Sequence, residues 1–312
     1  MSATNDITND TKPRPQKLDD VSGWFAPLDQ TLFATLLTRQ ERLGERGDLL
    51  EMGVFMGKSA IFLGRQLRDG EKFTVCDLFE SDAPDKANNA ETGKSYPTLT
   101  RDAFESNYLS FHDELPRVLH APTSVVPAEV EPKSCRFVHV DASHLYEHVY
   151  GDIGAAQDAL LLDGIVVLDD FRSEHTPGVS VAAWEAVLNR GLRPICLSTQ
   201  KLYGTWGDPA PLQELVIAMA RADDSCGLSI QQAAGHRIVR VVSHGMRAPE
   251  FPFSRHYVEP EPAPAVEAAA VPAPVARKKP RRSRSARLAI DVLPPFVTRS
   301  VQRSRARKRA RS

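Results

Sequence analysis

The sequence predicts an α/β fold in which a mostly parallel sheet carries helices on both faces. Short apolar runs alternate with amphipathic segments from residue 27 to residue 243. Apolar strands that alternate with helices are typical of parallel sheets covered on both sides. Glycines or aspartates directly follow several of these runs. Because such sheets bind ligands at the carboxyl ends of their strands, those residues are the first candidates for a functional site.

Each predicted element rests on the period of its apolar residues. Continuous apolar runs predict strands over residues 49–55, 73–78, 118–126, 136–141, 164–171, 194–198 and 238–243. Apolar residues at helical spacing predict helices over residues 27–43, 58–68, 99–111, 144–162, 179–189 and 212–221. Gly164 follows the fourth of these helices and is predicted to cap it.

The composition is typical of a soluble globular protein, with 42% hydrophobic and 25% charged residues among 312. No run of about 18 apolar residues is present, so no membrane-spanning helix is expected. Residues 1–17 lack the apolar stretch of a secretory signal. The four cysteines have no CxxC spacing, and three of them lie in apolar runs. We therefore expect buried free thiols and a cytoplasmic location.

Charge divides the chain into an acidic body and a basic tail. Residues 277–312 contain 14 of the 39 Lys and Arg and a single acidic residue, Asp291, which makes their net charge +13, whereas the preceding residues carry −14. We predict four parts: a disordered N-terminus over residues 1–20, a domain over 21–250, a Pro/Ala-rich linker over 251–280, and a basic tail, disordered or amphipathic, over 281–312.

The charge of the basic tail favours anionic partners. Polyanions or an anionic membrane, such as the inner face of the cell membrane, would attract it. Leu293, Phe296, Val297 and Val301 follow the spacing of a short amphipathic helix that could lie on such a membrane. Phe296 is the only aromatic residue of the tail, so nucleic-acid bases have no stacking platform. We expect no sequence-specific nucleic-acid binding, and a solvated tail without a partner is the alternative.

A glycine-containing turn follows the first predicted strand. Its sequence, EMGVFMGKS, has Gly53 and Gly57 between a strand and a helix. Such a turn lets the backbone approach a ligand, and the helix N-terminus offers N–H groups. The spacing is neither GxGxxG nor that of a Walker A loop, so the turn alone specifies no nucleotide. Asp77 ends the second strand, where a carboxylate can accept both hydroxyls of a ribose.

Three carboxylates follow two very apolar strands. Asp141 ends the fourth strand, and Asp169 and Asp170 follow the fifth. Left unpaired, they would repel one another. A hard divalent cation with oxygen ligands, such as Mg²⁺, would resolve this repulsion, and helix caps or ion pairs are the alternative. His144 lies in the same loop as Asp141, where an imidazole could take a proton near neutral pH.

These motifs resemble a known family when taken together and in order. The segments LLEMGVFMGKSAIFL, FTVCDLFE, RFVHVDASHLYEHVYGDI, LLLDGIVVLDDF and PGVSVAAWEAV occur between residues 22 and 205. With them the chain resembles class I S-adenosylmethionine-dependent methyltransferases. More narrowly, it resembles the metal-dependent O-methyltransferases that act on sugar hydroxyls, the macrocin and mycinamicin type. The resemblance implies a Rossmann-like sheet of seven strands with the methyl donor over its first half. Relatives often form homo-oligomers.

The resemblance also implies roles for individual residues. The positions that match the family's donor-binding residues are Glu51, Gly53, Gly57, Ser59 and Asp77. The positions that match its metal ligands are Asp141, Asp169 and Asp170, and His144 matches the general base. His144 and Asp141 would therefore be catalytic. Ala142 departs from the family, which has glycine at this position, where positive φ is tolerated.

The reaction implied by the resemblance is methyl transfer to the oxygen of a sugar or polyol hydroxyl, in a glycosylated natural product or a polysaccharide. A bound Mg²⁺ would chelate two vicinal acceptor oxygens and lower the pKa of the hydroxyl. His144 would remove the proton, and the oxygen would attack the sulfonium methyl group in line. The segment 80–116 is expected to shape the acceptor pocket. Trp24 and Phe25 fit either a lid over the donor or ordinary core positions.

Two other functional classes remain open from the residues. The segment His144-Leu-Tyr-Glu147-His148 matches the HxxEH pattern of inverted zinc peptidases, in which two histidines of one helix share a zinc ion. That pattern leaves the aspartate pair and the glycine turn unexplained. A same-fold, oxygenase-like relative without methyltransferase activity is the second alternative.

Overall fold

The structure is a computed structural model that describes residues 14–83, 86–89 and 99–259. Residues 1–259 form one compact unit, and residues 260–312 are assigned to a second. One nine-stranded sheet runs through the first unit in the order β3-β2-β1-β4-β5-β7-β6-β9-β8. The strands are β1 Asp48–Met52, β2 Phe73–Asp77, β3 Arg117–His120, β4 Cys135–Val140, β5 Leu160–Leu168, β6 Arg193–Leu197, β7 Leu202–Thr205, β8 Cys226–Ala233 and β9 His236–Ser243.

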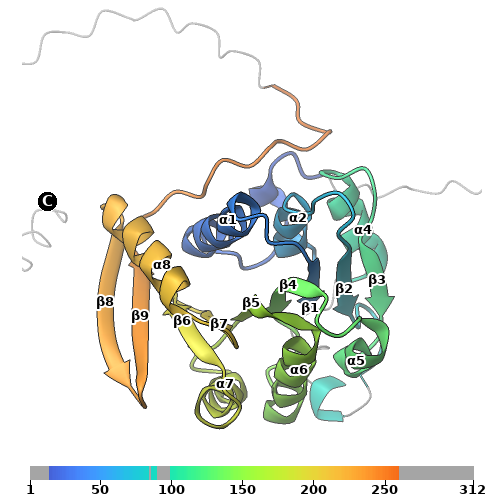
Figure 1. Ribbon diagram of the computed structural model, residues 1–312. Coiled ribbons are helices and arrows are strands. Elements are labelled where there is room, and N and C mark those ends of the chain that lie inside the picture. The colour runs from blue at the N-terminus through green and yellow to red at the C-terminus, as the bar shows by residue number, and fades with distance from the viewer. Residues whose placement is uncertain (1–13, 84–85, 90–98, 260–312) are drawn as a thin grey trace, which may run out of the picture. The chain divides into compact units, whose positions relative to one another are not determined.

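Helices cover both faces of the sheet (Figure 1), as the sequence predicts. The main helices are α1 Pro27–Arg42, α2 Lys58–Gly64, α4 Arg101–Leu109, α5 Val126–Glu129, α6 Tyr146–Ala159, α7 Pro177–Asn189 and α8 Ala210–Ala222. One face packs against α1, α2, α4 and α8, and the other against α5, α6 and α7. None of the helices in the described ranges is both long and apolar enough to cross a bilayer.

The strand order creates a switch point between β1 and β4. Strand β1 pairs in parallel with β2 on one side and with β4 on the other. From this point β2 and β3 extend the sheet in one direction, and β4 and β5 extend it in the other. The loops after β1 and β4 therefore diverge to opposite faces and leave a crevice, which is where open α/β sheets bind their ligands.

Alternate residues of each central strand face opposite layers, as the period of a strand requires. In β1, Leu49 packs into the core beneath α1 and α2, whereas Leu50 and Met52 pack into the core beneath α6 and α7. Glu51 faces the same layer as Leu49 and is registered with His139 of β4. This alternation places the polar side chains of Glu51 and His139 inside the otherwise apolar layer beneath α1 and α2.

The sheet has two more strands than the seven predicted, β7 and β8. Strand β7 is only four residues long and pairs antiparallel with both β5 and β6. Strand β8 is a polar edge strand whose last four residues are exposed. Neither segment contains the continuous apolar run on which the prediction relied. The mixed α/β class and the parallel centre of the sheet are confirmed.

The predicted end of the fourth helix is wrong. Helix α6 ends at Ala159, and β5 begins at once with Leu160, which pairs with Cys135 of β4. Gly164 lies inside β5 instead of capping the helix. Residues 159–168 are almost all apolar, so helical periodicity could not mark the point where the chain changes to a strand.

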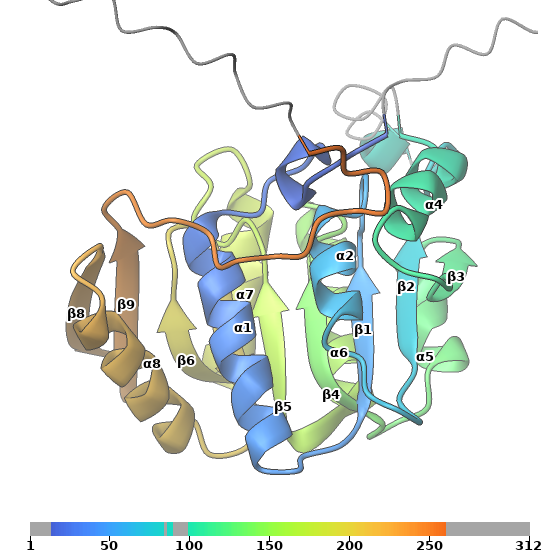
Figure 2. The same cartoon turned by 90° about the horizontal axis from the view of Figure 1, so that it is seen from above.

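The ordered unit is longer than the predicted domain over residues 21–250. Leu18 is buried, and the short 3-10 helix Leu18–Asp20 packs near α2. Beyond residue 250, Phe251 stacks on Phe62 of α2, and the Ser254 hydroxyl donates to the Pro15 carbonyl. Figure 2 shows this C-terminal segment crossing α1 and α2. Residues 14–20 and 251–259 thus belong to the domain because they cover its apolar surface, rather than to a disordered end and a linker.

Other predictions about the ends of the chain lie outside the described residues. They concern residues 1–13, most of the linker and the whole basic tail 281–312. Within the described part, all four cysteines are free thiols, and Cys76, Cys135 and Cys196 are buried as predicted.

Candidate active site

A cavity of about 1430 Å³ opens at the carboxyl ends of β1, β2, β4 and β5. Among the residues that line it are Trp24, Asp29, Gly53, Asp77, Asp141, His144, Asp152, Asp169, Asp170 and Lys201. Its volume exceeds the range of about 300–1,000 Å³ that is usual for a single small-molecule site. We call the part near Gly53, Asp77 and Asp152 the donor end, and the part near Asp141, Asp169, Asp170 and Lys201 the carboxylate end.

Gly53 is required where the loops after β1 and β4 cross. It has φ of +81°, and a Cβ atom there would lie 2.1 Å from the Asp141 carbonyl oxygen and 2.6 Å from Ala142 Cα. No side chain can occupy that space without displacing the backbone. Ala142 itself has no positive φ, so the departure from the family pattern introduces no backbone strain at that position.

Asp77 organises the turn after β1. Its Oδ2 accepts hydrogen bonds from the N–H groups of Val54 at 2.7 Å and Phe55 at 3.1 Å, and its Oδ1 accepts from Phe79 at 2.7 Å. Burial raises the pKa of Asp77, although the three N–H groups oppose the rise. The carboxylate therefore holds the turn in place and also faces the cavity, where its remaining lone pairs can accept hydroxyl groups.

Three of the predicted donor-binding residues lie behind the cavity wall. Gly57, Glu51 and Ser59 do not line the cavity. Glu51 is fully buried, and its Oε1 accepts from Ser59 Oγ at 2.5 Å and from His139 Nδ1 at 2.7 Å. Burial raises the pKa of Glu51 to about 8. Glu51 lies two residues before Gly53 and faces the same layer of the sheet, so its contacts with Ser59 and His139 support the turn from one position deeper in the strands.

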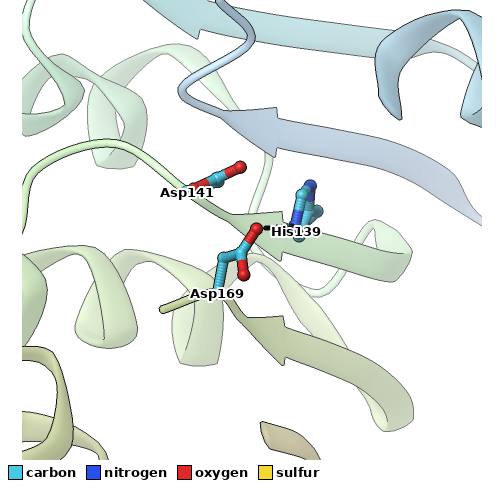
Figure 3. A group of neighbouring side chains, drawn as sticks. All are labelled: His139, Asp141 and Asp169. Carbon is cyan, nitrogen blue, oxygen red and sulfur yellow. Dashed lines mark ion pairs between the residues drawn. The ribbon is translucent and has the colours of Figure 1, made fainter. Parts of the chain in front are cut away.

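His139 was not predicted as a site residue, yet its Nε2 reaches the carboxylate end (Figure 3). Lys201 Nζ donates to that nitrogen at 3.2 Å, so the proton of the neutral imidazole lies on Nδ1 and is donated to Glu51. Burial and the charge of Lys201 lower the pKa of His139 to about 3. His139 is therefore neutral, and the lone pair on its Nε2 accepts from the Lys201 ammonium group beside Asp169.

The potential ligand atoms of His139, Asp141 and Asp169 lie within 4.8 Å of one another (Figure 3). Burial and the neighbouring Asp169 and Asp170 carboxylates raise the pKa of Asp141 well above its ordinary value. Burial also acts to raise the pKa of Asp169, but the Lys201 ammonium outweighs it and lowers that pKa. One lysine thus compensates only part of the negative charge gathered here.

Lys201 is the main residue that the sequence analysis missed. It is buried, lies directly before β7, and donates to Asp169 Oδ2. Because Leu202 of β7 is registered with Leu168 of β5, the next residues outward, Lys201 and Asp169, face each other. The only sequence signal was a lysine directly before a short apolar segment, and β7 itself was not predicted.

His144 and Asp170 form a hydrogen-bonded pair at the same end. His144 Nε2 lies 2.9 Å from Asp170 Oδ2, and Ser173 Oγ donates to Asp170 Oδ1 at 2.7 Å. Burial acts to raise the pKa of Asp170, but the His144 and Ser173 hydrogen bonds outweigh it and lower it to about 2. Asp170 has φ of +51°, a conformation uncommon for a residue with a side chain. Both of its oxygens already accept from protein groups.

The structure does not support the zinc-peptidase alternative. Helix α6 begins at Tyr146, so His144 precedes the helix and does not lie one turn from His148 on it. His148 Nδ1 lies 3.2 Å from the Ser143 hydroxyl. Among the described residues, the cluster suited to a metal contains neither of these histidines.

Asp152 of α6 is a third site residue, after His139 and Lys201, that was not predicted from the sequence. It lines the donor end, is 3% exposed, and its Oδ2 has no hydrogen-bond partner among the described residues. Burial raises the pKa of Asp152 to about 6, while Thr123 and the charge of His148 oppose the rise. A buried acceptor without a partner is costly unless a ligand supplies the donor.

Trp24 and Phe25 occupy different environments. Phe25 is buried against the rings of Phe33 and Phe62. Trp24 is 77% exposed, stacks on Phe55 with centroids 5.6 Å apart, and lines the cavity. Phe25 is therefore an ordinary core residue, whereas Trp24 lies at the rim of the cavity.

Residues 50–171 match the family model described as "Methyltransferase domain". The match covers β1 to β5 with the loops that form both ends of the cavity. Over these residues the chain is similar to methyltransferase domains. The predicted resemblance to methyltransferases is thereby confirmed for this part of the chain. No curated protein sequence matches the chain.

Several solved methyltransferase structures are similar to this chain at low sequence identity. The O-methyltransferase NovP is 17% identical, with 58% of this chain and 81% of that chain covered and a TM-score of 0.46. CalS11, a TDP-rhamnose 3'-O-methyltransferase, is 19% identical, with coverages of 59% and 82% and a TM-score of 0.41. MycE, in complex with Mg, SAH and mycinamycin VI, is 15% identical, with coverages of 64% and 56% and a TM-score of 0.38.

Proposed function

We propose that this protein is an S-adenosylmethionine-dependent O-methyltransferase, assisted by a divalent cation, that acts on a hydroxyl group of a sugar, a glycosylated natural product or a polysaccharide. One observation carries the proposal. The donor end and the carboxylate end belong to the same cavity, whose volume of about 1430 Å³ has room for a nucleoside donor beside an acceptor. Methyl transfer requires the two reactants to meet in this way.

The donor end supplies hydrogen-bond acceptors where a nucleoside needs them. The Asp77 carboxylate faces the cavity from the end of β2, the place where an acidic residue binds ribose hydroxyls in related α/β folds. Asp152 Oδ2, which has no partner among the described residues, can accept a hydrogen bond from the amino group of adenine. Gly53 keeps the intervening wall free of side chains, so that the donor can pass close to the backbone.

The carboxylate end suits a divalent cation. Oxygen donors from Asp141, Asp169 and Asp170 are ligands that Mg²⁺ and Mn²⁺ prefer. Burial and the carboxylates of Asp169 and Asp170, which Lys201 compensates only in part, raise the pKa of Asp141. His139 Nε2 is a further ligand atom within reach. A cation bound there would act as a Lewis acid on the acceptor hydroxyl. The protein's own part is to hold the acceptor oxygens beside the donor and away from water.

His144 is the proposed general base. Because its Nε2–H would donate to Asp170 at 2.9 Å, the lone pair of the neutral imidazole is on Nδ1. Nδ1 takes the acceptor proton, and Asp170 then stabilises the imidazolium through the hydrogen bond already in place. Since the sulfonium group of the donor is already activated, orientation and charge stabilisation would provide most of the acceleration.

Donor binding is the test of the proposed function. S-adenosylhomocysteine is titrated calorimetrically into the metal-stripped protein, with and without Mg²⁺. We expect micromolar affinity that Asp77→Ala weakens at least tenfold and that Asp69→Ala, a change in an exposed turn, leaves unchanged. Absence of binding by the folded wild-type protein would overturn the proposal. With binding established, sugar acceptors are screened in the presence of Mg²⁺.

For the basic tail, residues 281–312, we propose contact with anionic surfaces on the basis of its charge alone. Deleting residues 260–312 is expected to leave donor affinity unchanged and to weaken sedimentation with vesicles that contain anionic lipid. Equal sedimentation of both forms would refute the proposed contact. A cytoplasmic location and a homo-oligomeric state likewise remain predictions.

A further inference from the structure

Lys201 occupies the centre of the carboxylate end. The residue is buried, and its ammonium group donates to Asp169 Oδ2 and, at 3.2 Å, to His139 Nε2. These two acceptors are members of the group whose potential ligand atoms lie within 4.8 Å of one another. A protein cation thus uses the same lone pairs that a divalent cation would use.

The charges around Lys201 make the two cations alternatives. Burial acts to lower the pKa of Lys201, but Asp169, Asp141 and Asp29 outweigh it and raise that pKa, so the ammonium remains charged. Inside a protein, positive charges a few ångströms apart repel strongly because the surroundings screen them poorly. A divalent cation between Asp141 and Asp169 would therefore compete with the ammonium group for the same carboxylate oxygens.

Asp29 offers a second position for the ammonium group. Its carboxylate lines the same cavity, is buried, and accepts from the Tyr203 hydroxyl at 2.7 Å. Tyr203 belongs to β7, which Lys201 directly precedes. Lys201 also lines the cavity, and burial raises the pKa of Asp29 while the charge of Lys201 opposes the rise, so the two groups are near each other.

We propose that Lys201 is the resident cation of the carboxylate end and that a divalent cation binds there by exchange, displacing the ammonium group from Asp169 toward Asp29. This inference rests on the proposed function, because it concerns the cation of that same site. In the cation-free protein the ion pair between Lys201 and Asp169 keeps the buried carboxylates compensated. The exchange weakens divalent-cation affinity, since each binding event breaks that ion pair.

The test compares Mn²⁺ affinity among variants of the full-length, metal-stripped protein, measured by electron paramagnetic resonance of free Mn²⁺. We expect Lys201→Met to bind Mn²⁺ at least tenfold more tightly than the wild type, because the competing cation is gone. Lys72→Met removes an exposed lysine at the opposite end of β2 and should match the wild type. Lys201→Arg keeps a positive charge and should bind no more tightly than the wild type.

Equal or weaker affinity of Lys201→Met, or an Arg variant that binds as tightly as the Met variant, would overturn the exchange. A failure of every form to bind Mn²⁺ would overturn it as well. If Lys201→Met unfolds without metal, its thermal unfolding is followed with Mn²⁺ and with NaCl at equal ionic strength. Recovery of a cooperative transition with Mn²⁺ alone supports the exchange, and no recovery refutes it.

A parallel titration with S-adenosylhomocysteine separates this inference from the proposed function. Donor binding by all variants with unchanged Mn²⁺ affinity would refute the exchange and leave the methyltransferase proposal standing. Tighter Mn²⁺ binding by Lys201→Met without donor binding in any form would support the exchange and refute the proposed function.

Discussion

The two ends of the cavity are built in different ways. At the donor end the backbone determines the shape: Gly53 allows two loops to cross, and Asp77 is held by three backbone N–H groups. At the carboxylate end side chains from three strands determine the charge: Asp141 follows β4, Asp169 follows β5 and Lys201 precedes β7. Asp77 at the donor end is held by hydrogen bonds from the protein itself, whereas the carboxylate end holds more negative charge than one lysine compensates.

This difference shows which part of a binding site is local in sequence. A turn and the strand-end acid that holds it depend on short segments of chain and on the pairing of neighbouring strands. A cluster of charges depends on which distant segments the topology brings together. The donor end should therefore respond most to changes in backbone conformation, and the carboxylate end to changes in charge.

The largest expected effect concerns charge at the carboxylate end. Asp169→Asn removes the carboxylate paired with Lys201 and leaves a buried ammonium group poorly compensated. Breaking a buried ion pair in this way costs about 3–5 kcal/mol, and we expect a decrease of that order in the free energy of unfolding in urea. Asp82→Asn, at an exposed position on the cavity rim, is the control and should change stability by less than about 0.5 kcal/mol. A loss below about 1 kcal/mol for Asp169→Asn would show that the pair is not a source of stability.

The next largest expected effect is the loss of stability when Gly53, at the donor end, is replaced by alanine. Gly53 and Gly70 share a φ of +81°, but a Cβ atom at Gly53 would lie 2.1 Å from a carbonyl oxygen, whereas one at Gly70 would meet nothing within 4 Å. We expect Gly70→Ala to cost about 1–2 kcal/mol from strain alone. Gly53→Ala should cost about 3 kcal/mol or more and also abolish binding of S-adenosylhomocysteine. Equal losses for the two variants would mean that the loop crossing relaxes freely.

Asp152 is the donor-end residue whose effect should depend on pH. Burial raises its pKa to about 6 in the folded protein, above the value of 3.8 for an unperturbed aspartate. The folded state then binds the proton more tightly, so this stabilisation is complete below about pH 3.8 and is lost as the pH rises through 6. Relative to Asp152→Asn, the wild type should lose about 3 kcal/mol of unfolding free energy between pH 4 and pH 7, measured by urea denaturation. A pH-independent difference would contradict the shift.

The smallest expected effect is the loss of stability in Trp24→Ala, which tests whether Trp24 lies at the rim of the cavity or in the core. Trp24 is 77% exposed, so Trp24→Ala should lower stability by less than about 1 kcal/mol. Its matched variant, Phe25→Ala, removes a buried ring and should cost about 3–5 kcal/mol. Trp24 fluorescence should change on titration with S-adenosylhomocysteine in the wild type, and that change should vanish in Trp24→Ala. Comparable losses of stability would place Trp24 in the core instead.

Much of the fold was predictable because its signals are local. The helix Pro27–Arg42 and the strands at Leu50, Val75, Val138 and Val166 follow from the period of their apolar residues. Segments without such a period were missed, namely β7, β8 and the change from helix to strand at Leu160. At those positions pairing with neighbouring strands decides the conformation, and no pattern within the segment itself encodes it.

By itself, the sequence determined that Gly53, Asp77, Asp141 and Asp169 stand directly after apolar strands, and a parallel sheet must bring such positions to one edge. Only the tertiary structure decided which of their neighbours reach the cavity. The register of β1 and β4 places Glu51 beside His139, so that His139 Nε2 reaches the carboxylate end while Glu51 stays behind the imidazole. Lys201 lies opposite Asp169 because an antiparallel strand is inserted beside β5. Register and strand insertion are properties of paired chains, so no single segment can specify them.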